Sequence, residues 1–246
     1  MSSLRELNAR ERVIVALDCS AEDALSLAKI LKGKASWLKV GMTLYYKEGP
    51  AFVCTLKELG YKVFLDLKIY DIPFQAAGAV KSLLCSGADM FTLHASGGSE
   101  MMNGIACALK ESENPDAISL AVTVLTSMDE TTLHELNIAN TPADQVTSLA
   151  KLASESGISG VVASPHEAKD LRVLLGNSAY IVTPGVRPSG ASLDDQKRVA
   201  TPSVAIASGA SHIVVGRPIT KAESPVAAFE DIVKEIESIK PEEWAW

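Results

Sequence analysis

The chain has 246 residues, and 47% of them are hydrophobic, which is enough for a sizeable core and argues against a disordered chain. Its formal net charge of −7 and pI of about 5.2, with no basic patch, argue against nucleic acid as a main partner. No apolar run approaches the length of a membrane span, and the first residues lack the apolar centre of a signal peptide. We therefore expect a cytoplasmic protein with no membrane partner.

The cysteines and histidines show no metal-binding spacing. The four cysteines are far apart in the sequence, so they suggest neither a zinc site nor a disulfide framework: Cys19, Cys54, Cys85 and Cys107. The four histidines form no pair with the spacing of metal ligands, and we interpret them as structural: His94, His134, His166 and His212. We expect no bound metal and four free thiols in a reducing compartment.

Strand-like and helix-like stretches alternate along the whole chain. The predicted strands cover residues 13–18, 37–41, 62–69, 90–94, 118–125, 160–164, 180–185 and 212–216. The predicted helices cover 21–31, 50–59, 76–85, 98–110, 142–156, 166–175, 201–208 and 219–239, with a short extra helix between 128 and 141. No linker or change of composition divides the chain.

Eight strand–helix units with near-continuous apolar strands indicate a parallel sheet covered by helices. At this length they predict an α/β protein with one domain over residues 1–246, a single (β/α)₈ TIM barrel. A doubly wound open sheet is the structural alternative. It predicts a glycine-rich turn after the first strand, but the sequence there is Asp18-Cys19-Ser20-Ala21.

The third predicted strand carries charges that a buried strand should avoid. Because side chains alternate along a strand, Asp66 and Lys68 share a face with Phe64, while the opposite face is entirely apolar. Asp71 follows in the turn before Pro73. Charged groups at the C-terminal end of a parallel strand are typical of an active site in α/β enzymes.

Polar side chains also end other predicted strands. In a barrel the C-terminal ends of all strands meet at one face, so residues far apart in the sequence converge there. Besides Asp66 and Lys68, the candidates are Asp18, Lys39, Thr126, Ser127 and Arg217.

Two turns that contain glycine, arginine and proline predict a phosphate site. Loops after strands seven and eight are the usual phosphate site of such barrels. There Gly185 precedes Arg187, and Gly216 precedes Arg217. Glycine allows the backbone to approach an anion, and arginine donates two parallel hydrogen bonds to phosphate.

Seven motifs taken together resemble the orotidine 5′-monophosphate decarboxylase family along essentially the whole chain. They occur in the family's order at residues 15–18, 38–41, 64–73, 94–98, 122–127, 183–188 and 216–218. The resemblance implies decarboxylation of orotidine 5′-monophosphate to uridine 5′-monophosphate in de novo pyrimidine synthesis. It also implies a homodimeric barrel that needs neither a metal nor an organic cofactor.

The same resemblance implies roles for individual residues. Lys68 would protonate C6 of the pyrimidine, beside Asp66 and Lys39, and Asp71 would enter the active site of the partner across a two-fold interface. The substrate-binding residues would be Asp18, Thr126, Ser127, Arg187, Gln196, Gly216 and Arg217, with a loop at 186–197 closing over the site. One departure is visible: Phe74-Gln75 stands where the family commonly has Asn-Thr, so a contact of Gln75 with the ligand carries over only weakly.

Two other functions compete with this hypothesis. Related phosphosugar enzymes of the same barrel type, such as a keto-gulonate phosphate decarboxylase or a hexulose phosphate synthase, also use Asp-x-Lys-x-x-Asp but require Mg²⁺. Thr126-Ser127 and Arg187 favour the nucleotide enzyme. A barrel that binds a nucleotide without turnover, with Phe74 marking lost catalysis, is the non-enzyme alternative; the intact Lys39, Asp66, Lys68 and Asp71 argue against it.

Overall fold

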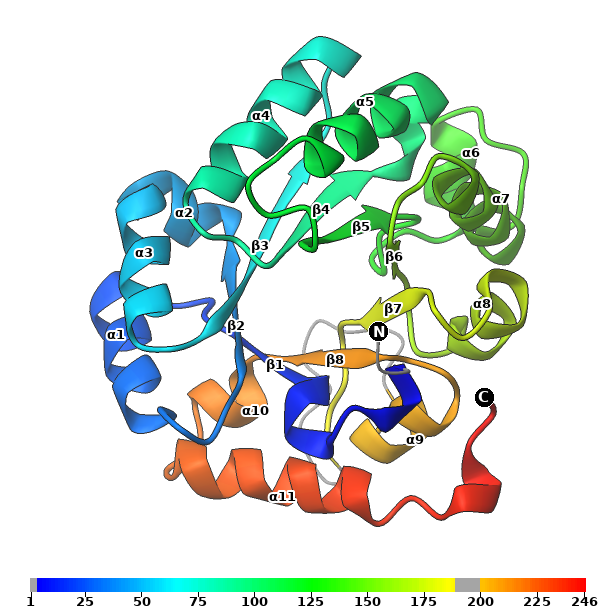
Figure 1. Cartoon of the computed structure of the whole chain (residues 1–246). Coiled ribbons are helices and arrows are strands. Elements are labelled where there is room, and N and C mark those ends of the chain that lie inside the picture. The colour runs from blue at the N-terminus through cyan, green and yellow to red at the C-terminus, as the bar shows by residue number, and fades with distance from the viewer. Residues whose placement is uncertain (1–3, 189–199) are drawn as a thin grey trace.

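A computed structural model describes residues 4–188 and 200–246 and shows a closed barrel of eight parallel strands (Figure 1). Each strand pairs with its neighbours in chain order, and β8 pairs with β1 to close the barrel. The strands are β1 Val13–Ala16, β2 Trp37–Gly41, β3 Lys62–Ile69, β4 Met90–His94, β5 Ile118–Val122, β6 Gly160–Val162, β7 Tyr180–Thr183 and β8 His212–Val215. The predicted (β/α)₈ barrel is confirmed.

A ring of helices surrounds the barrel (Figure 1). These helices are α1 Ala21–Ile30, α2 Met42–Glu48, α3 Pro50–Glu58, α4 Pro73–Cys85, α5 Gly98–Lys110, α6 Glu130–Glu135, α7 Pro142–Glu155, α8 Ala168–Leu175, α9 Pro202–Ala207, α10 Arg217–Thr220 and α11 Pro225–Glu237. Short 3₁₀ turns lie at Leu4–Glu6, Ala9–Arg12, Ala95–Gly97 and Pro241–Glu243. None of the described helices has both the length and the apolar character needed to cross a lipid bilayer.

Local sequence signals account for most helix starts. The side chains of Ser20, Thr141 and Thr201 accept a hydrogen bond from a backbone N–H in the first turn of α1, α7 and α9. Proline occupies the start of α3, α4, α7, α9 and α11, where its missing N–H costs nothing.

The main differences between the predicted helices and the structure lie in three places. α2 was not predicted, because its seven residues are too few to show a clear helical period. α4 begins at Pro73 rather than at residue 76, since a proline that ends the strand also begins the helix. The last helical region is divided into α10 and α11, and the side chain of Ser224 starts the second of them.

The core has two layers on either side of the strands. Alternate strand residues point into the barrel and form its interior cluster: Ile14, Ala16, Trp37, Phe64, Met90, Leu120, Val182 and Val214. Their neighbours along each strand point outward and pack beneath the helices. At the N-terminal end of the barrel, the fully buried ring of His212 lies against Trp37 and Tyr180. A filled interior leaves the C-terminal ends of the strands as the place for a ligand.

Two buried arginines, Arg12 and Arg172, and the C-terminal tail close the N-terminal end of the barrel. Arg172 is 2% exposed, and its guanidinium donates hydrogen bonds to the carbonyl oxygens of Gly176, Ala179 and Gly209 at 2.7–3.1 Å. Its guanidinium carbon lies 4.1 Å from the ring centroid of Trp246. Burial lowers the pKa of Arg172 to about 10, so the group stays cationic at neutral pH.

We expect Arg172→Ala to lower the free energy of unfolding by about 3 kcal/mol, because three carbonyl groups lose their donor, that of Gly209 in a buried place, and Trp246 loses its stacking partner. Urea unfolding at pH 7 measures the change. Lys151→Ala is the control: its side chain is 65% exposed in a surface ion pair, so its effect should stay within about 0.5 kcal/mol. Equal effects of the two substitutions would contradict this role of Arg172.

Candidate active site

A cavity of about 890 Å³ opens at the C-terminal ends of the strands. Its floor is apolar, formed by side chains such as Phe64, Val122, Val182 and Val214. Among the described residues, five basic and three acidic side chains line it: Lys39, Lys68, Arg187, Arg217 and Lys221, with Asp18, Asp23 and Asp66. An apolar floor beneath an excess of positive charge suits a flat ring that carries an anionic group.

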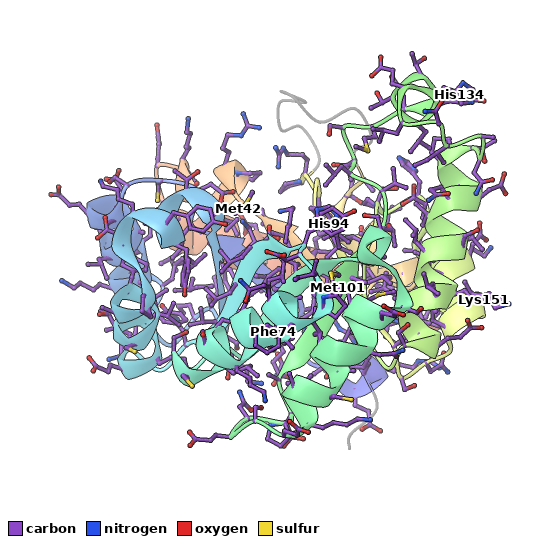
Figure 2. The ribbon with its side chains drawn as sticks, turned by 90° about the horizontal axis from the view of Figure 1, so that it is seen from above. Met42, Phe74, His94, Met101, His134 and Lys151 are labelled. Carbon is purple, nitrogen blue, oxygen red and sulfur yellow. The ribbon has the colours of Figure 1, made fainter. Side chains whose placement is uncertain are left out.

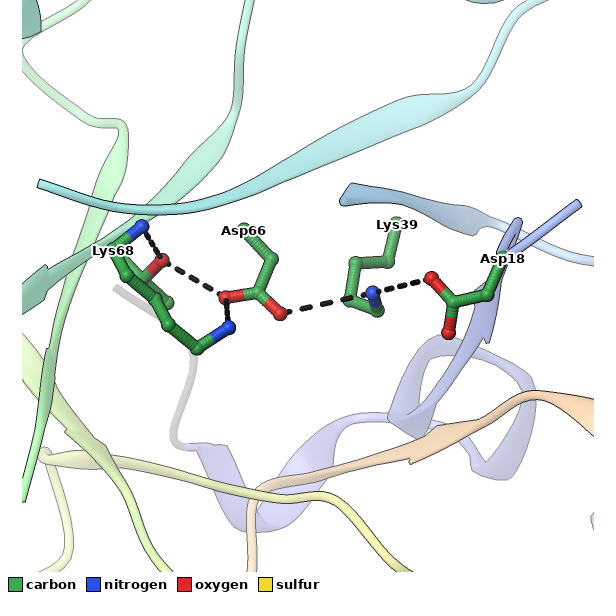
Figure 3. Close-up of polar contacts among 5 residues, drawn as sticks. Asp18, Lys39, Asp66 and Lys68 are labelled. Atoms are coloured by element: carbon green, nitrogen blue, oxygen red, sulfur yellow. Dashed lines mark hydrogen bonds and ion pairs between the residues drawn. The ribbon is translucent and has the colours of Figure 1, made fainter. Parts of the chain in front are cut away.

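Four charged side chains form a row of alternating sign along one wall (Figure 3). Lys39 Nζ lies 3.1 Å from Asp18 Oδ1 and 3.6 Å from Asp66 Oδ2. Lys68 Nζ lies 2.9 Å from Asp66 Oδ1. The row therefore reads Asp18, Lys39, Asp66, Lys68, and each inner group lies between two groups of opposite charge.

Asp66 is the most enclosed carboxylate of the row, with its side chain 19% exposed. Burial alone would raise its pKa, but Lys39 and Lys68 together, with hydrogen bonds from Lys68 and Thr92, outweigh burial and hold the pKa below its usual range. Asp66 is therefore ionised at neutral pH, and both lysines face a full negative charge.

Gly41 leaves room for this row. A Cβ atom at this position would come within 3.3 Å of Asp18 Oδ1 and 3.4 Å of Lys39 Nζ. Gly41 ends β2 directly after Lys39 and Val40, so the absence of a side chain there allows the first ion pair to form beside the strand end.

The end of β3 is less regular than simple alternation predicts. The pairing of β3 with β4 shifts between Leu65 and Ile69, and Lys68 has a φ of 52°. The side chains nevertheless lie on the two faces of the strand that alternation predicts. Leu67 and Ile69 pack on the outer core, while Asp66 and Lys68 line the cavity. Thr92 of β4 contacts both charged residues, although nothing in the sequence pattern marks it as a site residue.

His94 ends β4 beside the same lysine. It is half-buried, and its ring centroid lies 5.7 Å from that of Tyr70. Burial is the main reason why the pKa of His94 is lowered, and the nearby charge of Lys68 lowers it further. A neutral imidazole at pH 7 adds no competing cation next to Lys68.

The two arginines of the predicted phosphate site line the cavity after β7 and β8. Arg187, 7% exposed, follows β7, and its backbone N–H donates to the carbonyl oxygen of Ala200 at 3.0 Å. Arg217 is the first residue of α10, directly after Gly216. Gly185 has a φ of 75°, a left-handed conformation that glycine adopts without strain.

The structure brings most of the predicted site residues together. Those that line the cavity are Asp18, Lys39, Asp66, Lys68, Thr126, Arg187, Gly216 and Arg217. Three others are exposed and not among its lining residues: Asp71, Gln75 and Ser127. Gln196 and most of the loop expected to close over the site lie outside the described residues.

A second cavity of about 540 Å³ adjoins the first on the side of α2. It shares Asp18, Lys39, Asp66 and Lys68 with the first cavity and adds residues of α2, among them Met42 and Lys47. The row of alternating charges thus forms the boundary between the two cavities.

Comparison with known proteins agrees with this geometry. The model of the orotidine 5′-phosphate decarboxylase / HUMPS family matches residues 11–232. An orotidine 5′-phosphate decarboxylase of Synechococcus sp. (strain WH7803) is 47% identical over 235 residues, which cover 93% of this chain and 96% of the relative. One of Pseudoalteromonas translucida (strain TAC 125) is 46% identical over 92% of this chain and 97% of its own length.

The same relationship appears among solved structures. The crystal structure of orotidine 5′-phosphate decarboxylase from Lactobacillus acidophilus superposes with a TM-score of 0.83 at 40% sequence identity. The match covers 93% of this chain and 100% of that chain. The barrel, the charged row at its C-terminal end and these matches lead to one conclusion: this chain belongs to the orotidine 5′-phosphate decarboxylase / HUMPS family.

Proposed function

We propose that this chain decarboxylates orotidine 5′-monophosphate to uridine 5′-monophosphate in de novo pyrimidine synthesis. The observation that carries the proposal is the ammonium of Lys68, held 2.9 Å from a largely enclosed carboxylate in a cavity that two arginines also line. Four free cysteines fit the reducing cytoplasm, where we expect the enzyme to act.

Lys68 meets the two needs of this reaction. Loss of carbon dioxide from C6 leaves an anion that the pyrimidine ring cannot delocalise well. A cation must lie where that charge develops, and a proton donor must be within reach. The ammonium of Lys68 serves as both: it stabilises the developing carbanion and then protonates C6.

Asp66 holds the ammonium of Lys68 in place, and Lys39 in turn anchors Asp66. At about 4 Å and an effective dielectric constant of about 20, one such ion pair contributes roughly 4 kcal/mol before desolvation is counted. Asp66 forms a pair with each lysine, and Lys39 links Asp66 to Asp18. Because these charges are fixed before the substrate arrives, little reorganisation is needed when the carbanion forms.

The remaining cavity residues bind the parts of the nucleotide that do not react. Asp18, 64% exposed at the mouth, accepts hydrogen bonds from the ribose hydroxyls. Thr126 faces the ribose and the pyrimidine, and Ser127 joins it from the adjoining turn. The phosphate is held by Arg187, Arg217 and Gly216, with Gln196 from the loop at 186–197. Closure of that loop couples the binding energy of the phosphate to stabilisation of the transition state.

Asp71 acts in the active site of a second copy. Its carboxylate is exposed and accepts a hydrogen bond from the backbone N–H of Ile72 at 2.7 Å. The large apolar side chains around it are exposed too, with Ile72 at 65%, Tyr70 at 62% and Phe74 at 83%. An apolar surface beside a charged side chain suits a two-fold interface, and the second cavity beside Lys68 offers space for the Asp71 of a partner.

The departure at Phe74-Gln75 falls on this same surface, in the first turn of α4. Phe74 extends outward from α4, so it enlarges the apolar contact rather than filling the cavity of its own chain (Figure 2). Gln75 is an exposed hydrogen-bond donor with a longer side chain than the threonine common in the family, so its reach towards the ligand differs.

The first experiment measures the loss of orotidylate absorbance by the purified protein in the presence of a metal chelator. We expect full activity without metal, because Lys68 supplies the positive charge that Mg²⁺ supplies in the related phosphosugar enzymes. Orotidine, which lacks the phosphate, should react far more slowly, since Arg187 and Arg217 then have no anion to bind. Activity that requires Mg²⁺, or binding without turnover, would reject the proposal in favour of one of its two alternatives.

Lys68→Ala should remove nearly all turnover while nucleotide binding, measured by calorimetry, stays largely intact, because the ammonium acts mainly on the developing carbanion. Lys62→Ala is the matched control, since Lys62 lies at the opposite end of the same strand. A Lys68→Ala variant that keeps more than about a tenth of wild-type turnover, a deficit of only ~1.4 kcal/mol, would show that the proton donor is misassigned.

Mixing two inactive variants tests the shared site. If Lys68→Ala and Asp71→Ala chains are refolded together, a mixed dimer has one site with both lesions and one with neither. Random pairing makes about half of the dimers mixed, so roughly a quarter of all sites should regain activity under two-fold symmetry.

The matched control for this mixing experiment combines Lys68→Ala with Lys39→Ala. Both lysines lie in the site of one chain, so every site of that mixed dimer carries a lesion and no activity should return. No recovery from a verified mixed dimer of the Lys68 and Asp71 variants would refute a shared site.

A further inference from the structure

The irregular end of β3 lies opposite a single residue of β4. Leu65 pairs with Phe91 and Ile69 pairs with Leu93, so Asp66, Leu67 and Lys68 all lie opposite Thr92. Extra residues in one strand of a pair bend it and change the direction of its side chains, and such bulges recur next to active sites.

Lys68 has an unusual backbone conformation within this bulge. Its φ of 52° falls in the left-handed region, which a residue with a Cβ atom rarely adopts. Among the described residues other than glycine, Asn137 alone shares a positive φ. A conformation of this kind persists only where surrounding contacts hold it.

The hydroxyl of Thr92 supplies two of those contacts. Thr92 Oγ1 accepts a hydrogen bond from the backbone N–H of Lys68 at 2.9 Å. The same hydroxyl donates a hydrogen bond to Asp66 Oδ1 at 3.0 Å. Thr92 is fully buried, so water cannot replace either bond.

These bonds form a closed ring. Asp66 Oδ1 also accepts a hydrogen bond from Lys68 Nζ at 2.9 Å. The ring therefore runs from the backbone N–H of Lys68 through Thr92 and Asp66 to the ammonium of the same lysine (Figure 3). It fixes both ends of the lysine relative to one carboxylate oxygen.

We propose that Thr92 is a positioning residue: its hydroxyl holds the bulge of β3 and directs the ammonium of Lys68 to the place where charge develops. What the ammonium does there rests on the proposed function. The positioning itself rests on the ring of hydrogen bonds.

Removal of the hydroxyl leaves two polar groups without their partner in a buried place. Valine has nearly the same shape as threonine, so Thr92→Val keeps the packing of β4 but can neither accept from the Lys68 amide nor donate to Asp66. The bulge then loses the contact that holds its left-handed residue, and the ammonium loses its fixed direction. A purely structural threonine would affect stability and leave turnover per folded enzyme unchanged.

The test compares two pairs of proteins that differ in the hydroxyl: wild type with Thr92→Val, and Thr92→Ser with Thr92→Ala. In each pair we expect kcat to fall by about 10- to 100-fold without the hydroxyl, the range for a hydrogen bond to a charged group, while KM changes by less than about threefold. The second pair keeps the test valid if the valine variant does not fold.

Thr123→Val is the matched control. Thr123 is a buried threonine just after the end of β5, and its hydroxyl donates to the carbonyl oxygen of Val162 at 3.1 Å. Its loss should lower stability but leave kcat and KM unchanged. If Thr123→Val lowers kcat as much as Thr92→Val, or if the hydroxyl-free variants keep kcat within about twofold, the positioning role is wrong.

Two further measurements separate this proposal from the proposed function. The hydroxyl of Thr92 favours the ionised form of Asp66, so in Thr92→Val the pKa of Asp66 should rise and the acid limb of the pH–rate profile should move to higher pH. Exchange of the Lys68 amide hydrogen, followed by NMR, should be faster in Thr92→Val than in wild type. If wild type does not decarboxylate orotidylate, the proposed function fails, but amide exchange still tests the ring, and equal exchange in both proteins overturns it.

Discussion

Asp66 is a largely enclosed carboxylate that must remain ionised, and the arrangement of the whole site depends on this condition. A buried charge is stable only where opposite charges and hydrogen bonds compensate for lost water. Here that compensation comes from three different strands: Lys39 on β2, Lys68 on β3 and Thr92 on β4. Three features of the fold are therefore linked, because each helps to bring a partner to the same carboxylate. They are the order of the strands, the room left by Gly41 and the bulge of β3.

The residues that stabilise the barrel and the residues that form the active site lie at different levels along the barrel axis. Its interior is filled with apolar side chains, and its N-terminal end is closed by aromatic rings and by arginines bound to carbonyl groups. The C-terminal end keeps the charged groups and a cavity of about 890 Å³. The strain and the buried charge of the site can persist because the rest of the core is regular and apolar.

Much of this site could be predicted from single strands, while its internal geometry could not. Lys39, Asp66 and Lys68 stand out because charges interrupt apolar strands near their ends, and a parallel barrel must bring such ends together. The bulge and the φ of Lys68 depend on the register between β3 and β4, which no local pattern records. Thr92 is an ordinary strand residue in sequence, and its role appears only when β4 lies beside that bulge.

The closure of the N-terminal end also determines what the protein's fluorescence reports. The chain has three tryptophans, and Trp37 begins β2 while Trp244 and Trp246 stack on the arginines at that same end. The residues that line the nucleotide cavity include no tryptophan among those described. Indole emission should therefore follow the opening of the barrel floor during unfolding and respond little to a ligand at the opposite end. A probe of ligand binding would have to be introduced on the C-terminal side of the strands.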